Sequence, residues 1–166
     1  MRRLLRRAAR NRSVAATLLV ALLALCGVEV RALADDDRLP EVPGEARAFV
    51  GRFAVAVTSF DHKRVAADVE EVLAFGTPGF ERDFRAAMGA DFTERVTANR
   101  TVSTGTVVAG PQVQRRTGDR ASLLVVVDQR VTSEGSEAEP QIVRVGLLVT
   151  VQAVDGDPRI GAVQVL

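Results

Sequence analysis

The sequence predicts an α+β fold in which about three helices pack on a four-stranded antiparallel sheet. Apolar residues recur at spacings of three and four from residue 45 to about residue 99, which is typical of amphipathic helices. From residue 101 onward they alternate with polar residues, which is typical of strands with one buried face. Helices followed by a run of strands indicate an α+β domain with the helices on one face of the sheet.

The first helix is expected over residues 45–59. A second, over residues 63–75, follows a break at residues 60–62, and Asp61 is the expected capping residue. A third begins with Thr77 as its cap and Pro78 in its first turn. Gly89 is expected to interrupt it, leaving a short helical piece at 91–99. The inward-facing residues of the first helix are Ala46, Phe49, Val50, Phe53, Val57 and Phe60.

Four strands are expected at residues 101–114, 121–131, 141–154 and 159–165. The third has the clearest alternation, and the turn Asp155–Gly156–Asp157 links it to the fourth. Its predicted inward residues are Val143, Val145, Leu147, Val149, Val151 and Ala153. The outer face of this strand and the outer face of the first helix are the two predicted contact surfaces.

The N-terminal segment predicts export. Six arginines between residues 2 and 12 precede a run without charge from Val14 to Val28. The run is short for a membrane span, and Ala32–Leu33–Ala34 also fits a signal-peptide cleavage site, so both readings stay open. The predicted organisation is a cytoplasmic basic tail (1–12), a transmembrane anchor or signal peptide (13–34), a linker (35–44) and an extracytoplasmic domain (45–166). The arginines place the N-terminus in the cytoplasm by the positive-inside rule.

Composition narrows the function classes. Residues 1–34 carry a net charge of +6 and the remainder −5, so the folded part is acidic and does not suit nucleic acid. There is one His and one Cys, Cys26, which leaves zinc without its usual ligands and excludes an internal disulfide. We expect no metal and no cofactor.

The residues show no catalytic constellation, and we expect no enzyme activity. His62 lies beside Asp61 at a helix junction, where a cap and an exposed His explain both residues. Alternation places Asp128 on the outer sheet face beside Arg130, which favours a surface ion pair over a buried acid. A hydrophobic ligand is the alternative, and its candidate cavity lining is Phe49, Phe53, Phe80 and Phe84. The simpler interpretation is that these rings fill the core.

The order of elements resembles the cone-shaped fold shared by nuclear transport factor two, ketosteroid isomerase and cystatin-like domains. Shorter segments are similar to the actinobacterial Mce-associated membrane proteins, as is the basic stretch followed by one hydrophobic segment. One departure is that this family tends to carry a Trp after the last hairpin turn, where this chain has Asp157–Pro158–Arg159–Ile160. The similar segments are Thr58–Asp61, Asp68, Val72–Leu73, Gly76–Phe80, Phe84, Ala121–Asp128 and Arg144–Gly156.

The resemblance implies a non-enzymatic, single-pass envelope protein that serves as an accessory subunit of an Mce-type lipid import system. The expected partners are the membrane and proteins of that complex, and the chain itself as a homo-oligomer. The resemblance also favours the anchor over the signal peptide. The cone fold hosts isomerases, and it also occurs in inner-membrane components of secretion or conjugation machines, which is a further alternative.

Overall fold

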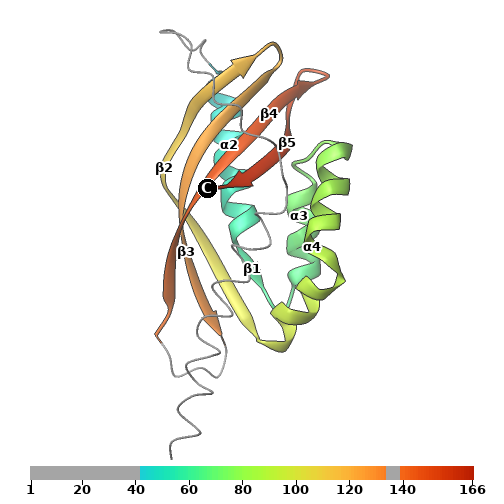
Figure 1. Cartoon of the computed structure of the whole chain (residues 1–166), viewed down its shortest axis with the longest axis vertical. Helices are drawn as coiled ribbons and strands as arrows, with labels where there is room; N and C mark the ends of the chain where they lie inside the picture. Colours follow the sequence, from blue (N-terminus) through green and yellow to red (C-terminus); the bar gives the residue numbers. More distant parts are fainter. Residues whose placement is uncertain (1–41, 134–138) are drawn as a thin grey trace, which may run out of the picture.

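A computed structural model of the chain describes residues 42–133 and 139–166 (Figure 1). The predicted transmembrane anchor, basic tail and most of the linker therefore lie outside the described residues. Among the residues that are described, none of the helices is both long and apolar enough to cross a membrane. The elements are α2 (Gly44–Thr58), β1 (Phe60–Asp61), α3 (Val65–Leu73), α4 (Pro78–Ala98), β2 (Thr101–Thr117), β3 (Arg120–Ser133), β4 (Gln141–Val154) and β5 (Asp157–Val165).

The strands form one antiparallel sheet in the order β1-β2-β3-β4-β5. This confirms the predicted α+β class. The sheet has five strands rather than four, because Phe60 and Asp61 pair with Ser103 and Val102 at the edge of β2. Two residues are too few to show a period of two, so the sequence showed only a break here.

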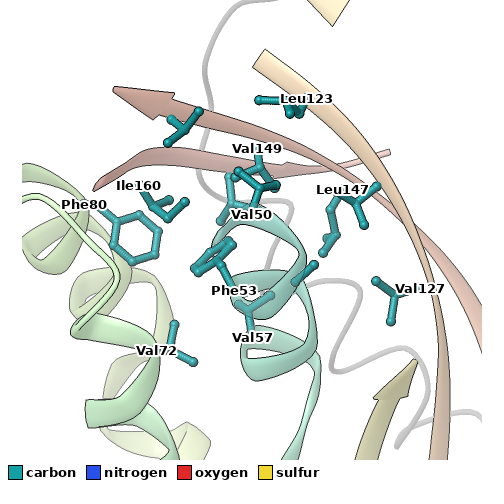
Figure 2. Close-up of a cluster of buried hydrophobic side chains, with 14 of the residues drawn as sticks. Val50, Phe53, Val57, Val72, Phe80, Leu123, Val127, Leu147, Val149 and Ile160 are labelled. Atoms are coloured by element: carbon teal, nitrogen blue, oxygen red, sulfur yellow. The ribbon is translucent and has the colours of Figure 1, made fainter. Parts of the chain in front are cut away.

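The core lies between α2 and the inner face of the sheet. Phe53 and Leu147 are 0% exposed, and Figure 2 shows Phe53 between Ile160 and Phe80 on one side and Leu147 on the other. The alternation in β4 is as predicted from Val145 to Val151, whereas Ala153 is exposed near the end of the strand. A second, smaller apolar cluster joins Phe60, Val65, Phe92 and Val96.

Two predictions about the helices were wrong in detail. Helix α4 continues through Gly89 to Ala98, so there is no separate short helix. Phe84 and Phe92 are both buried on α4, and their packing on either side of Gly89 outweighs the weak helix propensity of a single glycine. Asp61 does not cap α3: its Oδ1 accepts from the N–H of Lys63 at 2.8 Å, and α3 begins only after Arg64. The predicted cap at Thr77 is confirmed, because its hydroxyl accepts from the N–H of Phe80 at 3.2 Å.

Ile160 occupies the region where the resembled family tends to carry a Trp. It is 0% exposed. Its backbone also ties the sheet to the connection between α3 and α4: its N–H donates to the Phe75 carbonyl and its carbonyl accepts from Thr77, both at 2.9 Å. The last strand therefore has an aliphatic residue, rather than an aromatic one, packed into the core.

The C-terminal end of α2 is fixed to the sheet by a buried polar cluster. The carbonyl of Thr58 accepts from Ser103 Oγ at 2.8 Å and from Gln129 Nε2 at 3.0 Å. All three residues are buried. These bonds satisfy one of the carbonyls that the last turn of a helix leaves without a partner.

Removing this cluster is expected to destabilise the domain in a non-additive way. Ser103→Ala alone should cost about 1 kcal/mol and Gln129→Ala about 1–3 kcal/mol, since each leaves the other donor on the Thr58 carbonyl. The double variant should cost more than the sum, because the buried carbonyl then has neither donor. Chemical denaturation followed by circular dichroism measures these free energies, and strict additivity would contradict this account.

Candidate functional site

A large hollow on the described surface runs along the exposed side of α2. We call it the α2 groove. It has a volume of about 890 Å³ and is lined by α2, by α3, and by β1 with the start of β2. A second hollow of about 440 Å³ shares Ala48 and Arg52 with it and continues to Pro158 and Arg159 on β5. The predicted contact surface on the first helix is thus exposed and concave.

The α2 side of the groove carries small and apolar residues around one cation. Ala48 and Arg52 are exposed, and Val55 is 37% exposed. The guanidinium of Arg52 lies 5.8 Å from the ring centre of Phe49, in cation–π geometry. Within residues 42–133 and 139–166, no carboxylate lies within ion-pair distance of Arg52. Its charge is therefore available to a carboxylate that enters the groove.

The α3 side of the groove carries a fixed charge network. Arg64 Nε lies 2.6 Å from Asp68 Oδ1, and Arg64 Nη2 lies 3.4 Å from Glu71 Oε2. The hydrogen bond to Asp68 raises the pKa of Arg64 above its ordinary value. The other oxygen of Asp68 accepts from the N–H of Asp61 at 2.8 Å, which joins α3 to β1. This side of the groove therefore carries both positive and negative side chains, joined by hydrogen bonds.

The predicted cavity residues each pack against another phenylalanine ring. Phe53 and Phe80 are buried, with ring centres 5.6 Å apart, and the Phe80 and Phe84 rings stack at 5.4 Å. Phe49 is half-buried against Phe75. Of the four, Phe84 alone lines the small cavity between α2, α3 and α4. That cavity measures about 30 Å³, which is room for about one or two water molecules.

The two titratable residues singled out in the sequence lie apart. His62 Nδ1 is 3.4 Å from Asp61 Oδ1, at the junction of β1 and α3. Asp128 lies on the outer sheet face, as predicted, but its partner is Arg144 on β4 rather than Arg130. No group of three or more His, Cys, Asp or Glu side chains in the described part of the chain is placed to hold a metal ion.

The sequence identified the outer side of the first helix but not the groove. Its lining comes from three separate parts of the chain, and its depth depends on how they pack. Arg52 was recognisable only as a residue off the apolar stripe. The groove can accept a polypeptide segment, with small residues for close approach and a cation for a carboxylate.

Solved structures share this fold. An IcmL-like type IV secretion system protein from Legionella pneumophila has a TM-score of 0.64 at 11% identity, over 76% of this chain and 93% of that one. The periplasmic domain of DotI has a TM-score of 0.61 at 14% identity, over 78% of this chain and 99% of that one. CagV of Helicobacter pylori, a VirB8 homolog of a type IV secretion system, has a TM-score of 0.57 at 9% identity, over 71% of this chain and 96% of that one. At these identities the likeness shows the fold alone.

The comparison with curated proteins finds no match. A match to a protein family covers residues 12–166, which is nearly the whole sequence and includes every described element. The family is described as "Uncharacterized protein Rv1363c/MT1408-like". The chain therefore belongs to the Rv1363c/MT1408-like family.

Proposed function

We propose that the described domain works outside the cytoplasmic membrane as a non-enzymatic subunit of a multiprotein envelope assembly, and that it binds a partner through the α2 groove. The observation that carries the proposal is the groove itself. It is a hollow of about 890 Å³ along an exposed helix face, and among the described residues no carboxylate is paired with its Arg52. The fold supports the location, since the periplasmic domain of DotI shares it.

We propose that this assembly is a secretion system. Two of the solved structures that share the fold are described as components of type IV secretion systems. An accessory role in Mce-type lipid import is the second candidate. It is supported by the similarity of the segments around Phe60–Asp61 and Gly76–Phe80 to the Mce-associated membrane proteins.

Site-specific photocrosslinking in intact cells tests the proposal. A photoreactive amino acid at Val55, in the groove, is expected to capture a specific envelope protein, and mass spectrometry of the adduct separates a secretion component from a lipid-import subunit. The matched control places the same amino acid at Ala67, which is exposed on α3 and does not line the groove. The charge reversal Arg52→Glu should abolish the adduct at Val55. Equal adducts at both positions, or an adduct that survives Arg52→Glu, would contradict the proposal.

His62→Ala is expected to leave the Val55 adduct unchanged. His62 does not line the α2 groove, and the proposed role needs no proton transfer. The measurement is the yield of the adduct in cells that carry His62→Ala, with circular dichroism of the purified chain as the folding control. Loss of the adduct in a folded variant would instead favour a role for His62 in function.

A further inference from the structure

The outer face of the sheet carries apolar side chains where a solvent-facing strand ordinarily has polar ones. Helix α2 packs on the inner face, where Leu123, Val125 and Leu147 are fully buried. An antiparallel sheet with one solvated face usually alternates between apolar inside and polar outside. Here the outward positions at the centre of β3 and β4 are apolar as well. We call Leu124, Val126, Leu148 and Leu166 the outer patch; Leu166 is 67% exposed and the other three are half-buried.

The outer patch is continuous across the strands. Leu124 on β3 is directly opposite Leu148 on β4. Val126 is opposite Gly146, which has no side chain, and the N–H of Leu166 donates to the Gly146 carbonyl at 3.0 Å. Contiguous apolar surface of this kind, bordered by charges, is typical of an interaction site.

An acid and a base border the outer patch, one on each of the two central strands. Asp128 on β3 is directly opposite Arg144 on β4, with contacts of 2.7 and 2.8 Å. The side chain of Arg144 is 69% exposed and that of Asp128 is 26% exposed. Hydrogen bonding from Arg144 holds the pKa of Asp128 below its ordinary value, so the carboxylate is charged at neutral pH.

We infer that two copies of the chain associate through their outer patches, about a two-fold axis that runs parallel to β3 and β4 and between them. Such a rotation keeps the direction of every strand and lays β3 of each copy over β4 of the other, so the overlaid strands run in opposite directions, as β3 and β4 do within one sheet. Each Leu124 then faces Leu148 of the partner subunit, and each Asp128 faces Arg144 of the partner subunit. Face-to-face packing of two sheets about 10 Å apart, with their strands roughly aligned, is a common arrangement.

The charges favour a second copy over other occupants. A two-fold interface uses the same patch twice, so it must be complementary to itself. This face meets that condition because the acid and the base occupy directly paired positions on neighbouring strands. An anionic membrane surface would require one sign of charge. The dimer goes beyond the proposed function and is independent of it, since it needs only this chain.

Complementary charge variants of the full-length chain test the dimer. Asp128→Arg places two cations at this border of the patch, and Arg144→Asp places two anions there. In detergent solution, light scattering corrected for bound detergent should give a dimer for the wild type and a monomer for each variant alone. When the two variants carry different tags and are mixed, one tag should recover the other, because unlike charges then face each other only across the interface. Recovery of the mixed dimer would show that the charges act across the interface, because neither variant regains the Asp128–Arg144 pair within its own chain.

The Arg85–Glu70 pair provides the control. It has the same two-contact geometry, 2.9 Å for each bond, but joins α4 to α3. Glu70→Arg and Arg85→Glu should leave the dimer intact. Leu166→Asp, at the exposed edge of the outer patch, should reduce dimerisation with little risk to folding. A monomeric wild type would overturn the inference, as would a dimer that persists in Asp128→Arg, in Arg144→Asp and in Leu166→Asp. Neither result would affect the Val55 adduct on which the proposed function depends.

Discussion

Replacing Phe53 with aspartate is expected to unfold the domain. Phe53 is 0% exposed, and its ring lies 5.6 Å from Phe80 and 5.9 Å from Phe75. An uncompensated buried charge costs several kcal/mol, and loss of a packed aromatic ring adds about 3–5 kcal/mol. Together these approach the total stability of a typical domain, which is about 5–15 kcal/mol. Leu147→Asp, opposite α2 on β4, should have the same result.

Val55→Asp is the control for this prediction, because it introduces the same charge on the same helix. Val55 is 37% exposed, so its carboxylate would stay in water and should change stability by only about 0.5 kcal/mol. Circular dichroism and denaturant titration distinguish the two. A cooperatively folded Phe53→Asp protein would show that α2 does not pack on the sheet as described.

Adding a single methyl group at Gly105 is expected to destabilise the domain. A Cβ at this position would overlap Thr58 Oγ1 and would lie 3.0 Å from Thr58 Cβ and 3.2 Å from Val127 Cγ1. The C-terminal end of α2 crosses β2 here, with Thr58 0% exposed. Overpacking a rigid site costs about 1–3 kcal/mol. Gly105→Ala should therefore lower the denaturation midpoint clearly.

A double-mutant cycle identifies the cause of that effect. Thr58→Ala removes Oγ1, which is the atom that a Gly105 Cβ would overlap, so Gly105→Ala should cost less in the Thr58→Ala background. Gly44→Ala is the matched control, because among the described residues no atom outside its chain neighbours and its own helix backbone lies within 4 Å of a Cβ built there. Equal costs of Gly105→Ala in both backgrounds would mean that the close approach of α2 to β2 is not the source of the instability.

The strand pattern could be predicted well because the evidence for it is local. The expected bounds of the strand at residues 141–154 coincide with β4, since apolar and polar residues alternate there almost without interruption. The expected first helix differs from α2 by one residue at each end. The predicted interruption of the third helix at Gly89 was wrong. A single glycine is a weak helix breaker, and packing on both sides of it keeps the helix continuous.

Features that depend on pairing across the chain could not be predicted. Asp128 was expected beside Arg130, two residues along the same strand, but register places it opposite Arg144. Strand β1 exists because Phe60 and Asp61 meet β2, about forty residues later in the chain. The α2 groove combines α2, α3 and β2, and its shape follows only from their packing. The sequence pattern identifies which face of a helix or strand is exposed, but the surface that this face forms with its neighbours depends on the tertiary structure.

Impermeant thiol labelling of intact cells tests the location of the domain most directly. Cys26 is the only cysteine, so Cys26→Ser with Ala86→Cys leaves a single thiol on an exposed position of α4, away from both the α2 groove and the outer patch. A membrane-impermeant maleimide that passes the outer layers of the envelope should label this thiol in intact cells as completely as in lysed cells. Labelling only after lysis would place the domain in the cytoplasm and would contradict a role in an extracytoplasmic assembly.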